Sequence, residues 1–102
     1  MADKAVTAVA ASIDASNTED RVLIQNRGSS ILGGRLTLTN LGPNTVYLNV
    51  ADAAVTTTNA EDLTAGKVYL PANASLAIPQ GLNVFRIRCA AAETAKLILL
   101  GV

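Results

Sequence analysis

The sequence contains no histidine and a single cysteine, Cys89, among its 102 residues. Without a second cysteine the chain cannot form an internal disulfide. Without histidine it offers neither the usual zinc ligands nor a histidine acid–base group. These absences exclude the metal and nucleophilic sites that need such residues within one chain, and they favour a non-enzymatic function.

Large side chains are also scarce, because Tyr47, Tyr69 and Phe85 are the only aromatic residues. Half of the chain is hydrophobic, so the core must be built mainly from Val, Leu, Ile and Ala. A chain of this length forms one domain and buries about 65% of its unfolded surface. No apolar run approaches the roughly 18 residues that a transmembrane helix needs.

The charges balance, with eight basic and eight acidic residues. Such a chain has no electrostatic attraction for nucleic acid or for an anionic membrane. A small domain near zero net charge tends to associate, which favours an assembled state. The first residues lack the basic and apolar regions of a signal peptide, so we expect the protein to be made and used without secretion through a membrane.

The strongest pattern lies in Arg35–Val50, RLTLTNLGPNTVYLNV. Apolar and polar residues alternate at both ends of this stretch, as they do in strands with one buried face. Asn40–Asn44 interrupts the alternation with glycine, proline and asparagine, which form turns. The pattern predicts two strands joined by a five-residue turn.

Other short segments have the composition of strands and end at turn residues such as Pro71 and Pro79. They are Arg21–Asn26, Ala54–Thr58, Lys67–Leu70, Ala74–Ile78, Asn83–Cys89 and Ala95–Leu100. About seven or eight short antiparallel strands without a long helix predict an all-β fold, a single small β-sandwich. We expect a jelly-roll-like order first and an immunoglobulin-like order second.

Alternation also predicts which side chains form the core. The expected inward residues are Val22, Ile24, Leu36, Leu38, Val46, Leu48, Phe85 and Ile87. Cys89 continues the inward face of its strand and is expected to be a small buried hydrophobe.

Residues 1–20 differ from the rest and are predicted to form an N-terminal arm or an edge strand, with residues 21–102 as the sandwich domain. Val6, Val9 and Ile13 are spaced for one face of a helix, but the same Ala-rich run also fits a strand. A frayed terminus is the plain alternative. As an arm, the segment would use these three apolar residues to contact a partner.

Two further pairs are candidate protein contacts. Tyr47 and Tyr69 face away from the inward aliphatic residues, so they form either a contact surface or a second core layer. Arg86 and Arg88 share the outward face of one strand, where they either neutralise acids on a neighbouring subunit or protect an exposed strand. Leu97–Leu100 is apolar on both faces, so this strand is either central or buried at a subunit interface.

No residue is predicted to be catalytic, to bind a cofactor or to bind a metal. Gly33-Gly34-Arg35 lacks the spacing of a phosphate-binding loop and is expected to be a bend. Asp52, Glu61 and Asp62 have no calcium-loop spacing and are expected to be solvated loop acids. Asn73-Ala74-Ser75 matches a glycosylation acceptor by chance.

The order of these elements resembles a known class of proteins over Leu36–Leu100. The similar features are Thr39-Asn40-x-Gly42-x-Asn44-Thr45-Val46-Tyr47-Leu48, Gly66 through Leu70-Pro71, Leu76 through Gly81, Val84-Phe85-x-Ile87 and a final short strand. The pattern is similar to small β-sandwich proteins of tailed bacteriophages, the capsid decoration or cement proteins and related virion accessory domains.

That resemblance implies a virion structural protein on the outer surface of the capsid. Its partners would be the major capsid protein and further copies of itself, as a homotrimer, and terminal arms would grip the coat subunits. It implies no catalytic residue. The alternative is a tail- or fibre-associated binding module that recognises a host-surface glycan or another virion protein.

Overall fold

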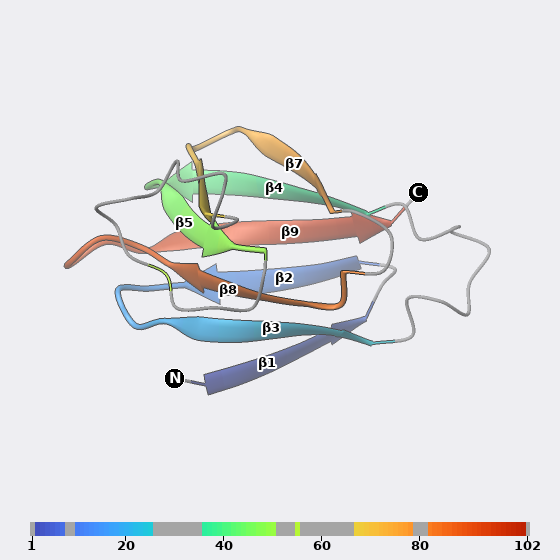
Figure 1. The fold of residues 1–102 in the computed structure, drawn as a ribbon. Coiled ribbons are helices and arrows are strands. Elements are labelled where there is room, and N and C mark those ends of the chain that lie inside the picture. Colours follow the sequence, from blue (N-terminus) through green and yellow to red (C-terminus); the bar gives the residue numbers. More distant parts are fainter. Residues whose placement is uncertain are drawn as a thin grey trace.

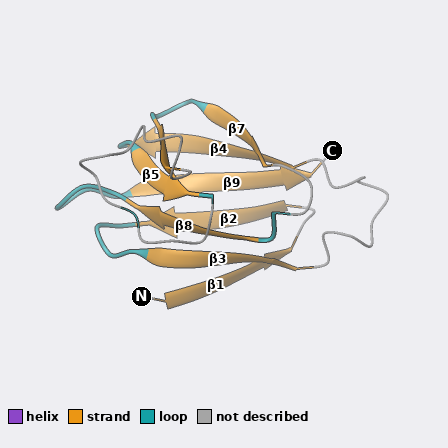
Figure 2. Ribbon diagram, in the orientation of Figure 1, coloured by secondary structure: helices purple, strands orange, loops and turns teal. Residues whose placement is uncertain are grey.

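A computed structural model of the chain describes residues 2–7, 10–25, 36–50, 55, 67–78 and 82–101. These residues form nine strands (Figures 1 and 2), and none of the described segments is a helix that could span a membrane. The strands are β1 (Ala2–Thr7), β2 (Ala10–Ala15), β3 (Asp20–Gln25), β4 (Leu36–Pro43), β5 (Val46–Asn49), β6 (Lys67–Leu70), β7 (Ser75–Ile78), β8 (Val84–Arg88) and β9 (Ala95–Gly101).

The strands form two sheets that pack face to face (Figure 1). The five-stranded sheet has the order β1-β3-β8-β5-β6, and the four-stranded sheet has the order β2-β9-β4-β7. From β2 to β9 all pairings are antiparallel, and each early strand lies beside a late one, β2 with β9 and β3 with β8. This winding is the strand order of a jelly roll, to which β1 adds a parallel edge strand beside β3. The predicted all-β sandwich is confirmed.

The core lies between the sheets and is almost entirely aliphatic. All eight residues predicted to face inward are buried, and Cys89 is buried with them. Alternating burial along β3, β4 and β8 follows the alternation of the sequence. Phe85 is the only aromatic residue of this core, so the packing depends on many side chains of similar size.

For the N-terminal segment the structure has the edge strand that was the alternative to a free arm. Residues 2–7 form β1 beside β3, and residues 10–15 form β2 beside β9. Val6, Ile13 and Ala15 are buried in the core. β1 and β2 are edge strands of the two sheets and face each other. The small alanine side chains of these two strands suit this place at the edges.

The stretch 35–50 contains the two predicted strands, but they do not form a hairpin. β4 pairs with β7 and β9 in one sheet, while β5 pairs with β6 and β8 in the other. The turn therefore carries the chain across the sandwich. Period-two alternation fixes which face of a strand is buried, but it does not fix which strand lies beside it.

The crossing is held by Asn40, whose side chain is fully buried. Its amide nitrogen donates to the carbonyl oxygens of Asn44 and Leu70, both at 2.8 Å, and its Oδ1 accepts the N–H of Gly42 at 2.8 Å. Gly42 has φ +91°, a value that favours glycine, and it precedes a cis peptide bond to Pro43. A Cβ on Gly42 would also lie 3.3 Å from the Cβ of Ala72. The sequence NLGPN thus specifies an irregular strand end stabilised from inside.

Replacing this side chain should destabilise the fold. In Asn40→Ala, one buried N–H and two carbonyl groups lose their partner, and a single unsatisfied buried group costs about 1–3 kcal/mol. We expect the free energy of unfolding in urea to fall by about 2–3 kcal/mol, with the slope against urea unchanged. Asn44→Ala is the matched control, because it removes only an exposed bond from Nδ2 to the carbonyl of Thr94. Equal losses in the two variants would contradict this role of Asn40.

Some sequence predictions lie outside the described residues. These are the strand expected at Ala54–Thr58 apart from Val55, the bend at Gly33-Gly34-Arg35, the acids Asp52, Glu61 and Asp62, and the contact residue Val9.

Candidate contact surface

The outer face of the five-stranded sheet carries four of the predicted contact residues. Tyr69, Tyr47 and Arg88 lie directly opposite one another on β6, β5 and β8. Arg86 lies in the neighbouring row, opposite Asn49. The sequence prediction therefore identified side chains of one face, although these strands are far apart in the chain.

Much of this face is already occupied by the chain itself. The Arg88 guanidinium donates to the carbonyl oxygens of Asn17 and Val55, at 3.1 and 3.4 Å. Glu19 lies 3.9 Å from Arg86 and accepts the N–H of Val55 at 2.6 Å. Val55 is only 2% exposed as a result of this packing. Both arginines thus have partners within the chain, which the sequence pattern did not reveal.

The remaining predicted contact residues differ in accessibility. Tyr69 is 40% exposed, whereas Tyr47 is half-buried. Val6 and Ile13 belong to the core, so they are not available to a partner in this fold. Only Tyr69 of the described set presents a large open surface.

The outer face of the four-stranded sheet is the more open one. Ile98 lies at its centre, between Ser12 on β2 and Thr39 on β4. Leu100 follows on the same face of β9 and is 50% exposed, and Leu41 on β4 is 49% exposed. Exposed apolar side chains that lie together mark interaction sites more often than scattered ones do.

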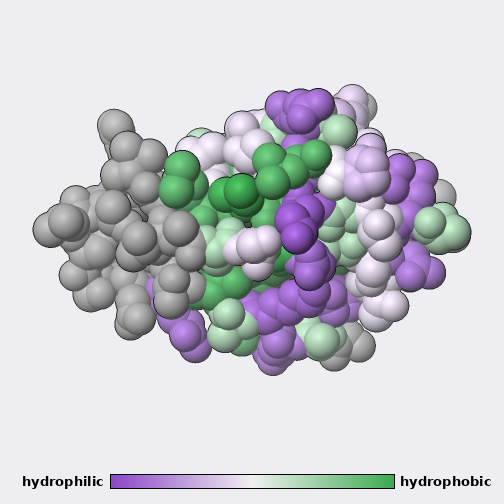
Figure 3. Space-filling view, turned by 180° about the vertical axis from the view of Figure 1, so that it is seen from behind, coloured by the Kyte–Doolittle hydropathy of each residue, from purple (hydrophilic) through white to green (hydrophobic). Residues whose placement is uncertain are grey.

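Figure 3 views the molecule from behind, where β2, β9 and β4 lie in Figure 1, and shows hydrophobic side chains grouped beside a band of hydrophilic ones. The small residues of this face are Ser12, Thr37, Thr39, Ser75 and Ala77. The hydroxyl groups of Thr39 and Ser75 bond to each other at 2.8 Å, so a partner can cover them at little cost. We call the surface formed by Leu41, Ile98, Leu100 and these small residues the apolar face.

One sequence pattern points to this surface. The run Leu97–Leu100 was compatible with a central strand or with an interface, and β9 is central in its sheet while Leu97 and Leu99 face the core. Ile98 and Leu100 face outward. Leu41 lies in the predicted turn, but β4 continues to Pro43 with unbroken alternation of burial, so Leu41 faces outward on the same side as Thr37 and Thr39.

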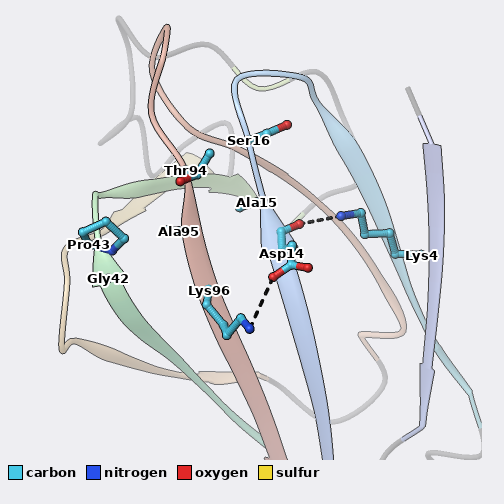
Figure 4. Close-up of a pocket in the computed structure, with 9 residues that line it drawn as sticks. All are labelled: Lys4, Asp14, Ala15, Ser16, Gly42, Pro43, Thr94, Ala95 and Lys96. Carbon is cyan, nitrogen blue, oxygen red and sulfur yellow. Dashed lines mark hydrogen bonds and ion pairs between the residues drawn. The ribbon is translucent and has the colours of Figure 1, made fainter.

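A hollow of about 350 Å³ lies at one end of the apolar face, between the ends of β2, β4 and β9 (Figure 4). Lys96 and Asp14 line it, with Nζ and Oδ1 3.9 Å apart. Lys4 donates to the carbonyl oxygen of Asp14 and pairs with Asp20 at 3.2 Å. The three charged side chains that line the hollow, Lys4, Asp14 and Lys96, thus interact with groups of the chain itself.

Two groups among the described residues have shifted pKa values. The Arg21 guanidinium donates two bonds to the Asp3 carboxylate, at 2.9 and 3.0 Å, and lowers the pKa of that carboxyl. Burial raises the pKa of the Cys89 thiol, which keeps it protonated and weakly nucleophilic. The Asp3–Arg21 ion pair links β1 to β3. The protonated Cys89 thiol fits a structural role in the core.

The described residues include no cluster of three or more His, Cys, Asp or Glu side chains that could hold a metal ion. Comparison with known proteins adds no assignment, since no family model, no curated protein and no solved structure matches this chain significantly.

Proposed function

We propose that this chain is a non-enzymatic structural protein of a virion, a decoration or cement subunit that binds the outside of a phage capsid. The apolar face would contact the major capsid protein. The observation that carries the proposal is this surface, on which Leu41 and Leu100 are about half exposed and Ile98 is partly exposed. Nucleic acid and membranes are not expected as partners of a chain with zero net charge.

Two further observations support this proposal. Jelly rolls are frequent in viral capsid domains, although they also occur in lectins and cupins, so the fold alone does not decide between functions. The sequence resemblance to capsid decoration proteins points to the first of these uses. On a capsid, many weakly bound copies of one subunit can be held firmly when they are linked to each other.

The apolar face can be tested with Leu100→Lys. This change places a charge at the exposed end of the face and leaves the buried Leu99 in place. We expect binding to the heads of the phage whose genome encodes this chain to weaken at least about tenfold, equivalent to about 1.4 kcal/mol. Co-sedimentation of the full chain with purified heads, across a range of protein concentrations, measures the effect.

Ala91→Lys is the matched control, because Ala91 is exposed in the turn between β8 and β9, outside the apolar face. It adds the same charge and should bind as the unmodified chain does. Equal binding by Leu100→Lys would exclude the apolar face as the contact. Binding of the unmodified chain to host cells or glycans, but not to heads, would instead favour the tail or fibre module.

A further inference from the structure

The edge strands of the two sheets differ in how they are protected. The edges are β1 and β6 in one sheet and β2 and β7 in the other. An edge strand presents unpaired backbone N–H and C=O groups, to which a strand of another chain can add. Proteins usually prevent this with charged residues, prolines, bulges or covering segments.

Three of the four edges carry charge. β1 contains Asp3 and Lys4, β6 begins at Lys67, and β2 contains Asp14. The Lys4 ammonium also donates to the backbone carbonyl of Asp14, so it occupies an acceptor on β2. These features match the usual means of keeping other strands away.

Among the residues that the structure describes, β7 has none of these features. Its sequence, Ser75-Leu76-Ala77-Ile78, contains no charge, proline or glycine. It pairs with β4 in an unbroken register from Leu36 opposite Ile78 to Thr39 opposite Ser75. Ser75 and Ala77 are exposed, and no described strand lies beyond them in the sheet.

The register also shows which backbone groups of β7 point outward. The N–H of Asn40 donates to the carbonyl of Ala74 at 2.9 Å, so residue 74 faces β4. In an antiparallel pair every second residue faces its partner. Leu76 and Ile78 therefore direct their backbone groups toward β4, whereas Ser75 and Ala77 direct theirs away from it.

We propose that β7 pairs with β7 of a second copy of this chain, antiparallel and centred on Leu76. Ser75 would then lie opposite Ala77 of the second copy, and each would exchange an N–H and a C=O bond with the other. The two Leu76 residues would meet at the two-fold axis. Leu76 is only partly buried in one chain, so this contact would cover more of its surface.

A second copy fits this edge better than an unrelated partner does. Identical strands arranged about a two-fold axis present matching donors and acceptors, and such an interface closes without forming a filament. The strand is uncharged and the chain has zero net charge, so the copies do not repel one another. The two four-stranded sheets would become one continuous sheet with both apolar faces on the same side.

The proposal does not depend on the proposed function, and it differs from the homotrimer that the sequence resemblance implies. Pairing of β7 with itself uses the whole edge and leaves no place for a third copy. If both proposals hold, each dimer presents two apolar faces to the capsid, and the linked contacts strengthen binding.

Ala77→Pro tests the pairing in the full chain. Proline removes the N–H of residue 77, which points away from β4, so the inner ladder keeps its bonds. Sedimentation equilibrium from about 10 µM to about 1 mM covers the range of weak dimers. We expect the unmodified chain and Ala77→Val to dimerise, and Ala77→Pro to weaken dimerisation at least about tenfold. A chain that stays monomeric, forms trimers, or dimerises equally with Ala77→Pro would overturn the proposal.

If Ala77→Pro does not fold, a crosslinking experiment tests the pairing of β7 between two copies of the chain. Residues opposite each other in a non-hydrogen-bonded pair have Cα atoms about 4.5 Å apart, within disulfide range. Leu76→Cys should therefore form a disulfide-linked dimer on mild oxidation. Ser75→Cys should not, because its partner in this register is Ala77 of the second copy. Cys89 is buried and gives no background reaction. Crosslinking of both variants, or of neither, would overturn the register.

Discussion

A variant that begins at Arg21 is expected to lose the cooperative unfolding transition of the full chain. The deletion removes β1 and β2, and with them the buried side chains of Ile13 and Ala15. It also leaves β9 without its partner on one side, where Ile13 lies opposite Leu97. Circular dichroism should show weak β signal, and heating should give a broad, non-cooperative change.

The size of this effect follows from the packing. Burying one Ile side chain contributes about 1.5–3 kcal/mol, and the whole stability of a small domain is about 5–15 kcal/mol. The deletion also uncovers Leu97 and Leu99, which are fully buried in the complete fold. Together these losses are comparable with the total stability.

A variant that begins at Ala10 provides the control. It lacks only β1, which contributes Val6 to the core and the Asp3–Arg21 pair to the surface. We expect this shorter deletion to keep a cooperative transition at a lower temperature. Cooperative unfolding of the Arg21 variant would show that residues 1–20 are an accessory segment after all.

Phe85→Ala is expected to lower the free energy of unfolding by about 3–5 kcal/mol, the usual range for a buried aromatic residue. Phe85 is fully buried on β8, opposite Val22 on β3. No other aromatic side chain belongs to this core, and aliphatic neighbours held in two sheets cannot collapse to fill the space. Chemical denaturation measures the loss as a shift of the midpoint.

Val84→Ala is the matched control for Phe85, because Val84 precedes it on the same strand and faces the other side. It is half-buried, so we expect a loss of about 1 kcal/mol or less. A loss below about 1 kcal/mol for Phe85→Ala would mean that the strand register is displaced by one residue.

The sequence allowed the core to be predicted because burial in a strand follows a local rule. Phe85 and Ile87 alternate with Arg86 and Arg88, and a period of two assigns each to a face whatever the neighbouring strand is. The bounds of β6 were predicted correctly because Pro71 ends the strand. At these positions the local sequence was enough to predict burial and the bounds of the strand.

The pairing of strands could not be predicted in the same way. Ala10–Ala15 has too few large side chains to show which face is buried, so its place beside β9 depends on residues that lie far away in the sequence. The crossing at Asn40 was taken for a hairpin turn for the same reason. Both differences concern contacts between distant segments, which periodicity does not record.

The candidate surface was predicted only in part. The tyrosine and arginine residues predicted as contacts lie on the five-stranded sheet, but Glu19 and Val55 bind the two arginines there. The apolar face includes Leu41 because β4 continues through the predicted turn as far as Pro43. The open edge at β7 becomes apparent only when the strand order is known.

The pairing of β2 with β9 has a consequence for synthesis of the protein. β2 is synthesised long before β9. Its ladder with β9 cannot form until Leu97, the partner of Ile13, has been synthesised. Contacts between such distant residues slow folding, because closing the long loop between them loses conformational entropy before the strands can pair. During translation the incomplete sandwich therefore exposes apolar strands, and such a chain is prone to aggregation until β9 has been made.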